Sequence, residues 1–180
     1  MFLDEVHYSC LIIQAANKRV AIDTLKSADR AFRRHRNGLQ GKLETLKDKF
    51  SIEIKEPLSL VSINKTRNCL VHRRGIVSRD DCNDGDNMTV TWRGIDLHIE
   101  TESGETVSIH PITDSSFSQQ IVVPAKGWIK GIYCKRKKAF PFKSGVSFST
   151  GELAEICYYF IDCIKEVVIT AQEYANRYRT

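Results

Sequence analysis

The segment Asn64–Val77 has the sequence NKTRNCLVHRRGIV and contains the residues from which the fold of this chain can be inferred. Pro57 lies upstream of it and is well placed for the first turn of a helix, where the N–H that proline lacks would be unpaired anyway. Gly75 lies near its end, and glycine is the residue that most readily closes a helix in a left-handed conformation. We therefore expect a helix from Pro57 to about Arg73.

Arg67, Asn68 and His72 lie near the end of this expected helix and form a candidate catalytic site. Arginine keeps its charge and offers two donors to a phosphate, whereas histidine exchanges protons close to neutral pH. Arg67 and His72 are five residues apart, which separates them by roughly 140° around a helix axis. A two-fold dimer that packs two copies of the helix together would gather both pairs in one cleft.

An Arg and a His with this spacing also occur at Arg30 with His35 and at Arg93 with His98. Neither of those arginines is followed by a polar residue, whereas Arg67 is followed by an asparagine, then by an apolar pair before the histidine and by a closing glycine. The context therefore singles out the Arg67 motif.

These residues resemble the signature of the HEPN (higher eukaryotes and prokaryotes nucleotide-binding) domain family: an Arg, a polar residue and a His near the end of a bundle helix. The resemblance implies a dimeric, metal-independent endoribonuclease that cleaves RNA by attack of the 2′-hydroxyl, in some members as a toxin or defence effector. It implies that His72 acts as general acid or base, that Arg67 stabilises the transition state and that Asn68 positions one of them. Arg74 stands where some members carry a modifiable tyrosine, so regulation by that modification is not expected.

Helical patterns flank the motif on both sides. Apolar residues recur at helical spacing from Leu3 to about Leu25, and a shorter helix is expected around Leu43 to Phe50, after a connection that includes Asn37–Gly38 and Gly41. Ser149 and Glu152 have the spacing of a capping box, which predicts a long helix over roughly 150–178.

Between Met88 and Tyr133 the apolar residues alternate, which predicts antiparallel strands, and Ile121–Val123 is a further strand candidate. The expected fold is mainly α (α+β): a HEPN-like antiparallel helical bundle with a β-rich insert before the long C-terminal helix. We expect one domain over residues 1–180, with helical parts 1–83 and 149–180 and an insert of about 84–148. Replacing residues 84–146 by a short Gly-Ser bridge should leave a folded helical core.

A second group of residues predicts contacts with RNA. A basic run is followed by Phe140, Phe142 and Lys143, and the interleaving of cations with aromatic rings is typical of single-strand binders. The alternative is a solvated loop whose charge serves solubility. The expected RNA-binding residues are Arg73, Arg74, Lys135, Arg136, Lys137 and Lys138.

Composition narrows the classes of function. The 27 Lys and Arg against 22 Asp and Glu give a net charge of +5, so polyanions are permitted partners. The six cysteines include no Cys-x-x-Cys pair, and no metal or other cofactor is expected. Reduced thiols and the start of the chain favour the cytoplasm. The most apolar stretch, Ile156–Ile169, is interrupted by charges and predicts no membrane span.

Two hypotheses of function stay open. The first is the endoribonuclease, with RNA as substrate, a homodimer as active form and an antitoxin or companion protein as a further partner. The second is a non-catalytic dimeric HEPN module that binds RNA, a nucleotide or a protein. A helical DNA-binding regulator is the weakest alternative, because no short helix–turn–helix pattern occurs.

Overall fold

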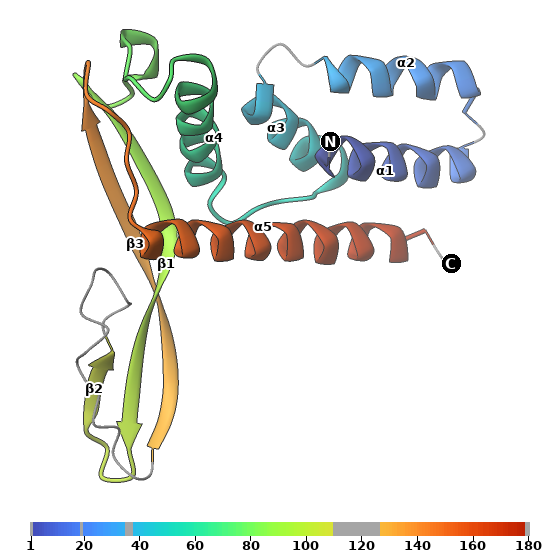
Figure 1. Ribbon diagram of the computed structural model, residues 1–180. Coiled ribbons are helices and arrows are strands. Elements are labelled where there is room, and N and C mark those ends of the chain that lie inside the picture. Colours follow the sequence, from blue (N-terminus) through green and yellow to red (C-terminus); the bar gives the residue numbers. More distant parts are fainter. Residues whose placement is uncertain (1, 19, 35–37, 110–126, 179–180) are drawn as a thin grey trace. The chain divides into compact units, whose positions relative to one another are not determined.

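The computed structural model describes residues 2–18, 20–34, 38–109 and 127–178 (Figure 1). These residues form a mixed α+β structure, in which helices combine with an antiparallel sheet of order β2-β1-β3. None of the helices within the described ranges is long and apolar enough to cross a bilayer. The elements are α1 (Phe2–Lys18), α2 (Ile22–Arg33), α3 (Gly38–Phe50), α4 (Pro57–His72), β1 (Asn87–Thr101), β2 (Thr106–Ile109), β3 (Gly127–Pro141) and α5 (Thr150–Asn176), with a short 3-10 helix at Arg79–Asp81.

The chain divides into two compact units. Met1–Val61 and Ile161–Thr180 form a helical unit, and Ser62–Phe160 form a hairpin unit. Both boundaries fall inside helices, in α4 and in α5, and not in a linker. The single domain expected over residues 1–180 therefore stays a prediction.

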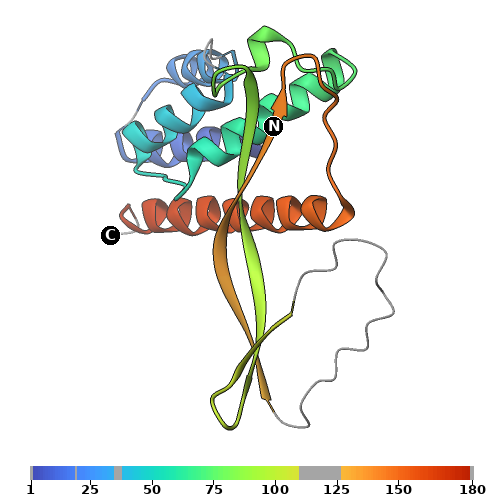
Figure 2. The ribbon, with the colours of Figure 1, turned by 90° about the vertical axis from the view of Figure 1, so that its left-hand side faces the viewer.

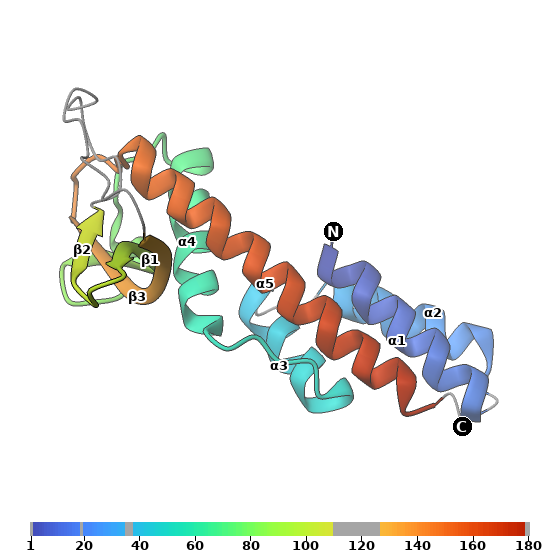
Figure 3. The ribbon, with the colours of Figure 1, turned by 90° about the horizontal axis from the view of Figure 1, so that it is seen from below.

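In the helical unit, the expected single helix from Leu3 to about Leu25 is wrong. The chain leaves α1 at Lys18, and Ala21 is extended before α2 begins. Figure 3 shows α1 and α2 side by side. This return buries Phe32 of α2, and the apolar spacing along the sequence does not reveal it because it depends on contacts between the two helices. Gly41 was expected in a connection but is buried inside α3.

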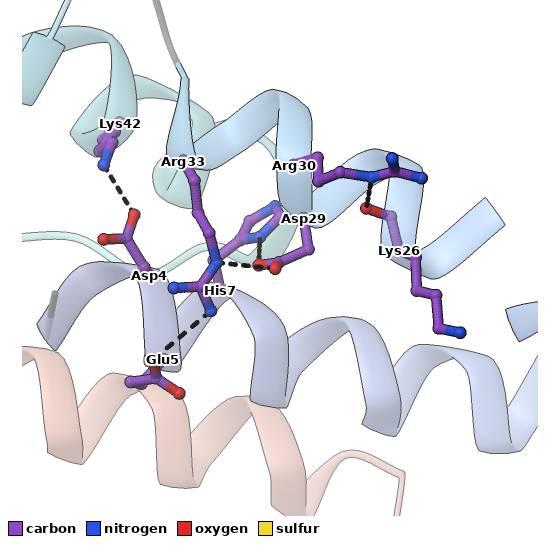
Figure 4. A network of polar contacts seen from close by, with 8 residues as sticks. All are labelled: Asp4, Glu5, His7, Lys26, Asp29, Arg30, Arg33 and Lys42. Carbon is purple, nitrogen blue, oxygen red and sulfur yellow. Dashed lines mark hydrogen bonds and ion pairs between the residues drawn. The ribbon is translucent and has the colours of Figure 1, made fainter. Parts of the chain in front are cut away.

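His7 lies at the centre of this helical packing (Figure 4). Its side chain is 1% exposed and its ring stacks on Phe32 with the centroids 3.9 Å apart. Asp29 Oδ1 is 3.9 Å from Nδ1, which is too long for a hydrogen bond, and Asp29 itself accepts one from Arg33 at 2.7 Å. Burial lowers the pKa of His7 to about 4, with the charge of Lys49 acting in the same direction. His7 is thus a neutral core residue.

The burial of His7 predicts a pH-dependent stability. The folded pKa of about 4 lies below the value of 6.5 expected for an unfolded chain, so the unfolded state takes up the proton first as the pH falls. The free energy of unfolding should drop by roughly 3 kcal/mol between pH 7 and pH 4. His7→Phe should remove most of this slope above pH 5, because it deletes the titrating imidazole. Urea unfolding across this pH range measures it, and equal slopes in both proteins would contradict the assignment.

In the hairpin unit, β1 and β3 pair along their whole length, with Trp92 opposite Arg136 and Thr101 opposite Gly127, and they twist about each other (Figure 2). β2 pairs with the far part of β1, where Leu97 faces Ile109. The strands predicted between Met88 and Tyr133 are thus confirmed, and β3 extends further, to Pro141. Ile121–Val123 lies outside the described residues.

The part of β1 before Gly94 belongs to the core of the hairpin unit. Met88, Val90 and Trp92 alternate along β1 and are almost fully buried. Ser62 of α4 accepts a hydrogen bond from the Thr91 N–H at 3.1 Å, and the Trp92 indole donates to Glu155 of α5 at 2.9 Å. Whether the insert can be excised stays a prediction, but excision would remove these core side chains from the hairpin unit.

Gly94 allows β3 to be tied to α5. Arg136 bonds Glu155 at 3.0 Å and Asp96 at 2.7 Å. A Cβ atom at Gly94 would lie 2.7 Å from Arg136 Nε and 2.9 Å from Glu155 Oε1. The absence of a side chain at this position is thus what leaves room for the ion pair.

Gly94→Ala should force Arg136 and Glu155 apart and destabilise the protein by about 2 kcal/mol, because both charges are largely buried. Gly145→Ala is the matched control: no atom lies within 4 Å of its would-be Cβ, and its stability should change by less than about 0.5 kcal/mol. Denaturant midpoints of both variants measure this. A Gly94→Ala protein as stable as the control would show that the ion pair adapts without cost.

Candidate functional site

The candidate site lies at the C-terminal end of α4, whose observed bounds agree with the predicted ones to within a residue. The helix is closed by a turn over Arg73–Ile76, in which the Ile76 N–H donates to the Arg73 carbonyl at 3.1 Å. The Gly75 N–H also returns to the Cys69 carbonyl at 3.2 Å. Cys69 is fully buried, so this end of α4 is anchored while the opposite side of the helix faces outward.

Arg67 and His72 are both exposed in the last turns of α4. Asn68, which lies between them in the sequence, is half-buried. Arg67 Nη1 donates to Asn68 Oδ1 at 3.3 Å. The His72 imidazole has no hydrogen-bond partner within the described part of the chain. One copy of the chain therefore does not join Arg67 to His72, and Asn68 contacts the arginine instead of the histidine.

Apolar side chains surround these polar ones. Leu70 is 46% exposed, Val71 57% and Ile76 51%, although all three are aliphatic residues of the kind that usually lie in a core. Leu70 and Val71 lie between Asn68 and His72 in the helix, and Ile76 follows the closing turn. The polar candidates are thus interleaved with an uncovered apolar surface, which we call the α4 patch (Leu70, Val71 and Ile76).

Arg73 is tied to a buried carboxylate. It bonds Asp81 at 2.9 Å, and the Asp81 side chain is only 2% exposed. Burial alone would raise the pKa of Asp81, but the hydrogen bonds from Ser78 and the charge of Arg73 hold it below the usual value. Arg73 therefore has a structural role, whereas Arg74 is exposed and has no carboxylate partner among the described residues.

The basic run lies in β3 and not in a loop. Strand alternation directs Arg136 to Glu155 and Lys138 to Glu152, whose carboxylate is 2.7 Å from Lys138 Nζ. Lys137 pairs with Asp84 at 3.0 Å. Of the run, only Lys135 is left without a carboxylate partner in the described ranges, so most of its positive charge is already neutralised locally.

The structure also brings a distant segment to the end of α4. Ile76 bridges Gly145, the Val146 N–H donates to the Gly75 carbonyl at 2.8 Å, and the Lys143 N–H donates to the Val77 carbonyl at 2.9 Å. We call residues 73–77 together with 141–146 the ledge. No local sequence signal pairs these segments, because their contact depends on the whole hairpin lying between them.

An aromatic ring of the ledge is flanked by cations. Arg79 lies 4.9 Å and Lys143 5.3 Å from the centre of the Phe142 ring. Arg79 also pairs with Asp86. The sequence pattern indicated Phe142 and Lys143, which lie beside the basic run. It did not indicate Arg79, because Arg79 precedes β1 in the chain whereas Phe142 follows β3.

Outside the end of α4, a site in the described residues would need a cavity or a metal-binding group. A cavity of about 190 Å³ in the helical unit is lined by α3, by residues 52–54 and by the start of α4, and the Lys47–Glu53 ion pair, 2.6 Å long, is among its lining residues. In the part of the chain that the structure describes, no three His, Cys, Asp or Glu side chains are placed to hold a metal ion. The end of α4 thus remains the candidate site.

Comparison of the chain with models of protein families, with curated proteins and with solved structures found no match in any of the three. The resemblance to the HEPN family therefore rests on the Arg67–His72 motif and its setting at the end of α4.

Proposed function

We propose that this protein is a metal-independent endoribonuclease of the HEPN type that is active as a homodimer. The observation that carries the proposal is that Arg67 and His72 lie exposed at one helix end, interleaved with the uncovered α4 patch. A surface of this composition fits a site that is completed when a second copy covers it.

The need for a second copy follows from the geometry of one helix. Arg67 is turned roughly 140° from His72 and is hydrogen-bonded to Asn68. A two-fold axis beside the α4 patch would bury Leu70, Val71 and Ile76 against their symmetry mates and bring two arginines and two histidines to one cleft. Burial of apolar side chains would supply the association energy, at roughly 25 cal/mol per Å².

In the proposed reaction, a base removes the proton of a 2′-hydroxyl and the resulting oxygen attacks the adjacent phosphorus. The bond to the 5′-oxygen breaks, and an acid protonates that leaving oxygen. The products are a 2′,3′-cyclic phosphate and a 5′-hydroxyl. His72 serves as the base or the acid, Arg67 stabilises the charge on the phosphate oxygens, and Asn68 positions Arg67.

The second candidate is a non-catalytic dimeric module. It is favoured by the exposed apolar side chains of β3, where Trp128 is 75% exposed, Ile129 74% and Tyr133 60%. Such a surface is typical of protein-binding sites, and a companion protein such as an antitoxin is a suitable partner. A nuclease assay with excess chelator separates the two candidates.

His72→Ala and Arg67→Ala should each reduce cleavage of RNA by about a hundredfold or more, because one removes a proton-transfer group and the other a preorganised charge. Arg30→Ala is the matched control: this exposed arginine has the same spacing to a histidine and donates a hydrogen bond to the Lys26 carbonyl, and its loss should leave the rate unchanged. Arg93 is unsuitable as a control, because it stacks on Tyr133 at 4.9 Å. Equal losses in the Arg67 and Arg30 variants would mean that the wrong pair has been chosen.

Val71→Glu should dissociate the dimer and abolish cleavage while the helix content stays constant, because it places a charge in the α4 patch. Leu58→Glu, a change on the same helix at a residue that is 73% exposed but distant from the patch along α4, should leave both properties intact. Light scattering gives the mass, and circular dichroism the helix content. A wild-type protein that is monomeric and still cleaves RNA would refute the composite site.

A further inference from the structure

Two cationic residues of the ledge hold an unfavourable backbone conformation. Arg74 has φ 55° and Lys143 has φ 64°, in the left-handed region that side chains other than glycine and asparagine rarely adopt. Arg74 is the second residue of the turn that closes α4. Lys143 is the third residue of a turn over Pro141–Ser144, where the Ser144 N–H donates to the Pro141 carbonyl at 3.0 Å. Turns with positive φ at these positions favour small residues, yet the chain carries two long cations.

The two turns belong to one structure beside the candidate site. The short ladder through Ile76 and Gly145 joins them, so that Arg74 and Lys143 lie near its opposite ends, roughly 13 Å apart along the strand direction. Arg74 follows His72 by two residues in the chain. The ledge therefore continues the surface of the end of α4.

Arg74 and Lys143 also differ from the other cations nearby in their pairing. Arg73 and Arg79 are neutralised by Asp81 and Asp86. Arg74 and Lys143 are exposed and have no carboxylate partner within the residues that the structure describes. Two unneutralised cations on one ledge, with the ring of Phe142 next to Lys143, are the elements with which proteins hold the backbone and a base of a single strand.

We propose that Arg74 and Lys143 bind phosphates of a single-stranded RNA, so that the ledge guides the substrate to His72. The inference rests on the proposed function and extends it by naming where the substrate strand runs and which side chains hold it. It replaces the basic run of β3, whose charges are mostly paired, as the main RNA-binding surface. On this proposal, the unfavourable backbone conformation at both residues is retained because their charged side chains bind the phosphates of the substrate.

Glycine substitutions test this directly, because they remove the cation and relieve the backbone at the same time. Arg74→Gly and Lys143→Gly should each weaken binding of a short fluorescent oligouridylate and flatten the salt dependence of log K by about 0.7, the value for one phosphate contact of a single strand. Each should also keep or raise Tm, by roughly 1–4 °C. His72→Ala serves as the background for all variants, so that the RNA is not cut.

Ser51→Gly is the matched control, since Ser51 is the remaining non-glycine residue with positive φ in the described chain (φ 58°) and lies at the end of α3. It should raise Tm in the same way and leave the salt slope unchanged. Lys143→Arg keeps the charge and should keep the slope. If the protein binds RNA but both glycine variants keep the wild-type slope, the ledge is not the binding surface and only this inference fails. If the wild-type chain neither binds nor cleaves RNA, the proposed function fails as well.

Discussion

The carboxylate of Glu155 holds the hairpin unit together. It accepts a hydrogen bond from the Trp92 indole of β1 and pairs with the Arg136 guanidinium of β3, so that three segments far apart in the sequence meet at one side chain of α5. Removing two opposite charges from water is favourable only when both are well paired. Here Glu155 also accepts from Trp92, and Arg136 also pairs with Asp96. The position of β3 in turn fixes where the chain leaves the hairpin, and that places the segment from Pro141 against the end of α4.

Elements with local signals could be predicted from the sequence. Pro57 and Gly75 bracket α4, and the Ser149–Glu152 capping box, predicted from spacing, is present at the start of α5, where the Ser149 N–H donates to Glu152 at 2.7 Å. The break between α1 and α2 could not be predicted in this way. It is stabilised by the stacking of His7 on Phe32, a contact between helices that no periodicity within one helix records.

The same division applies to the candidate site. The polar motif around Arg67 is contiguous and therefore visible in the sequence, as is the basic run. Which cations remain available is a tertiary property: Lys138 is neutralised by the first turn of α5, whereas Lys143, five residues later, is not. The pairing of the two ledge segments also depends on the entire hairpin, since Val77 and Ser144 are brought together only when β1 and β3 have paired.

The alternation of β1 changes phase at Gly94. Buried side chains occupy Met88, Val90 and Trp92 before it, and the apolar positions after it are Ile95, Leu97 and Ile99, on the opposite face of the continuous ladder. Side chains repeat every two residues along a strand, so lengthening both distal strands by two residues each preserves every contact near α5. A single residue inserted between Trp92 and Gly94 would instead turn the buried side chains Met88, Val90 and Trp92 to the opposite face of the strand. The part of the hairpin beyond Gly94 can therefore be lengthened without changing the packing near α5, whereas the part before Gly94 cannot.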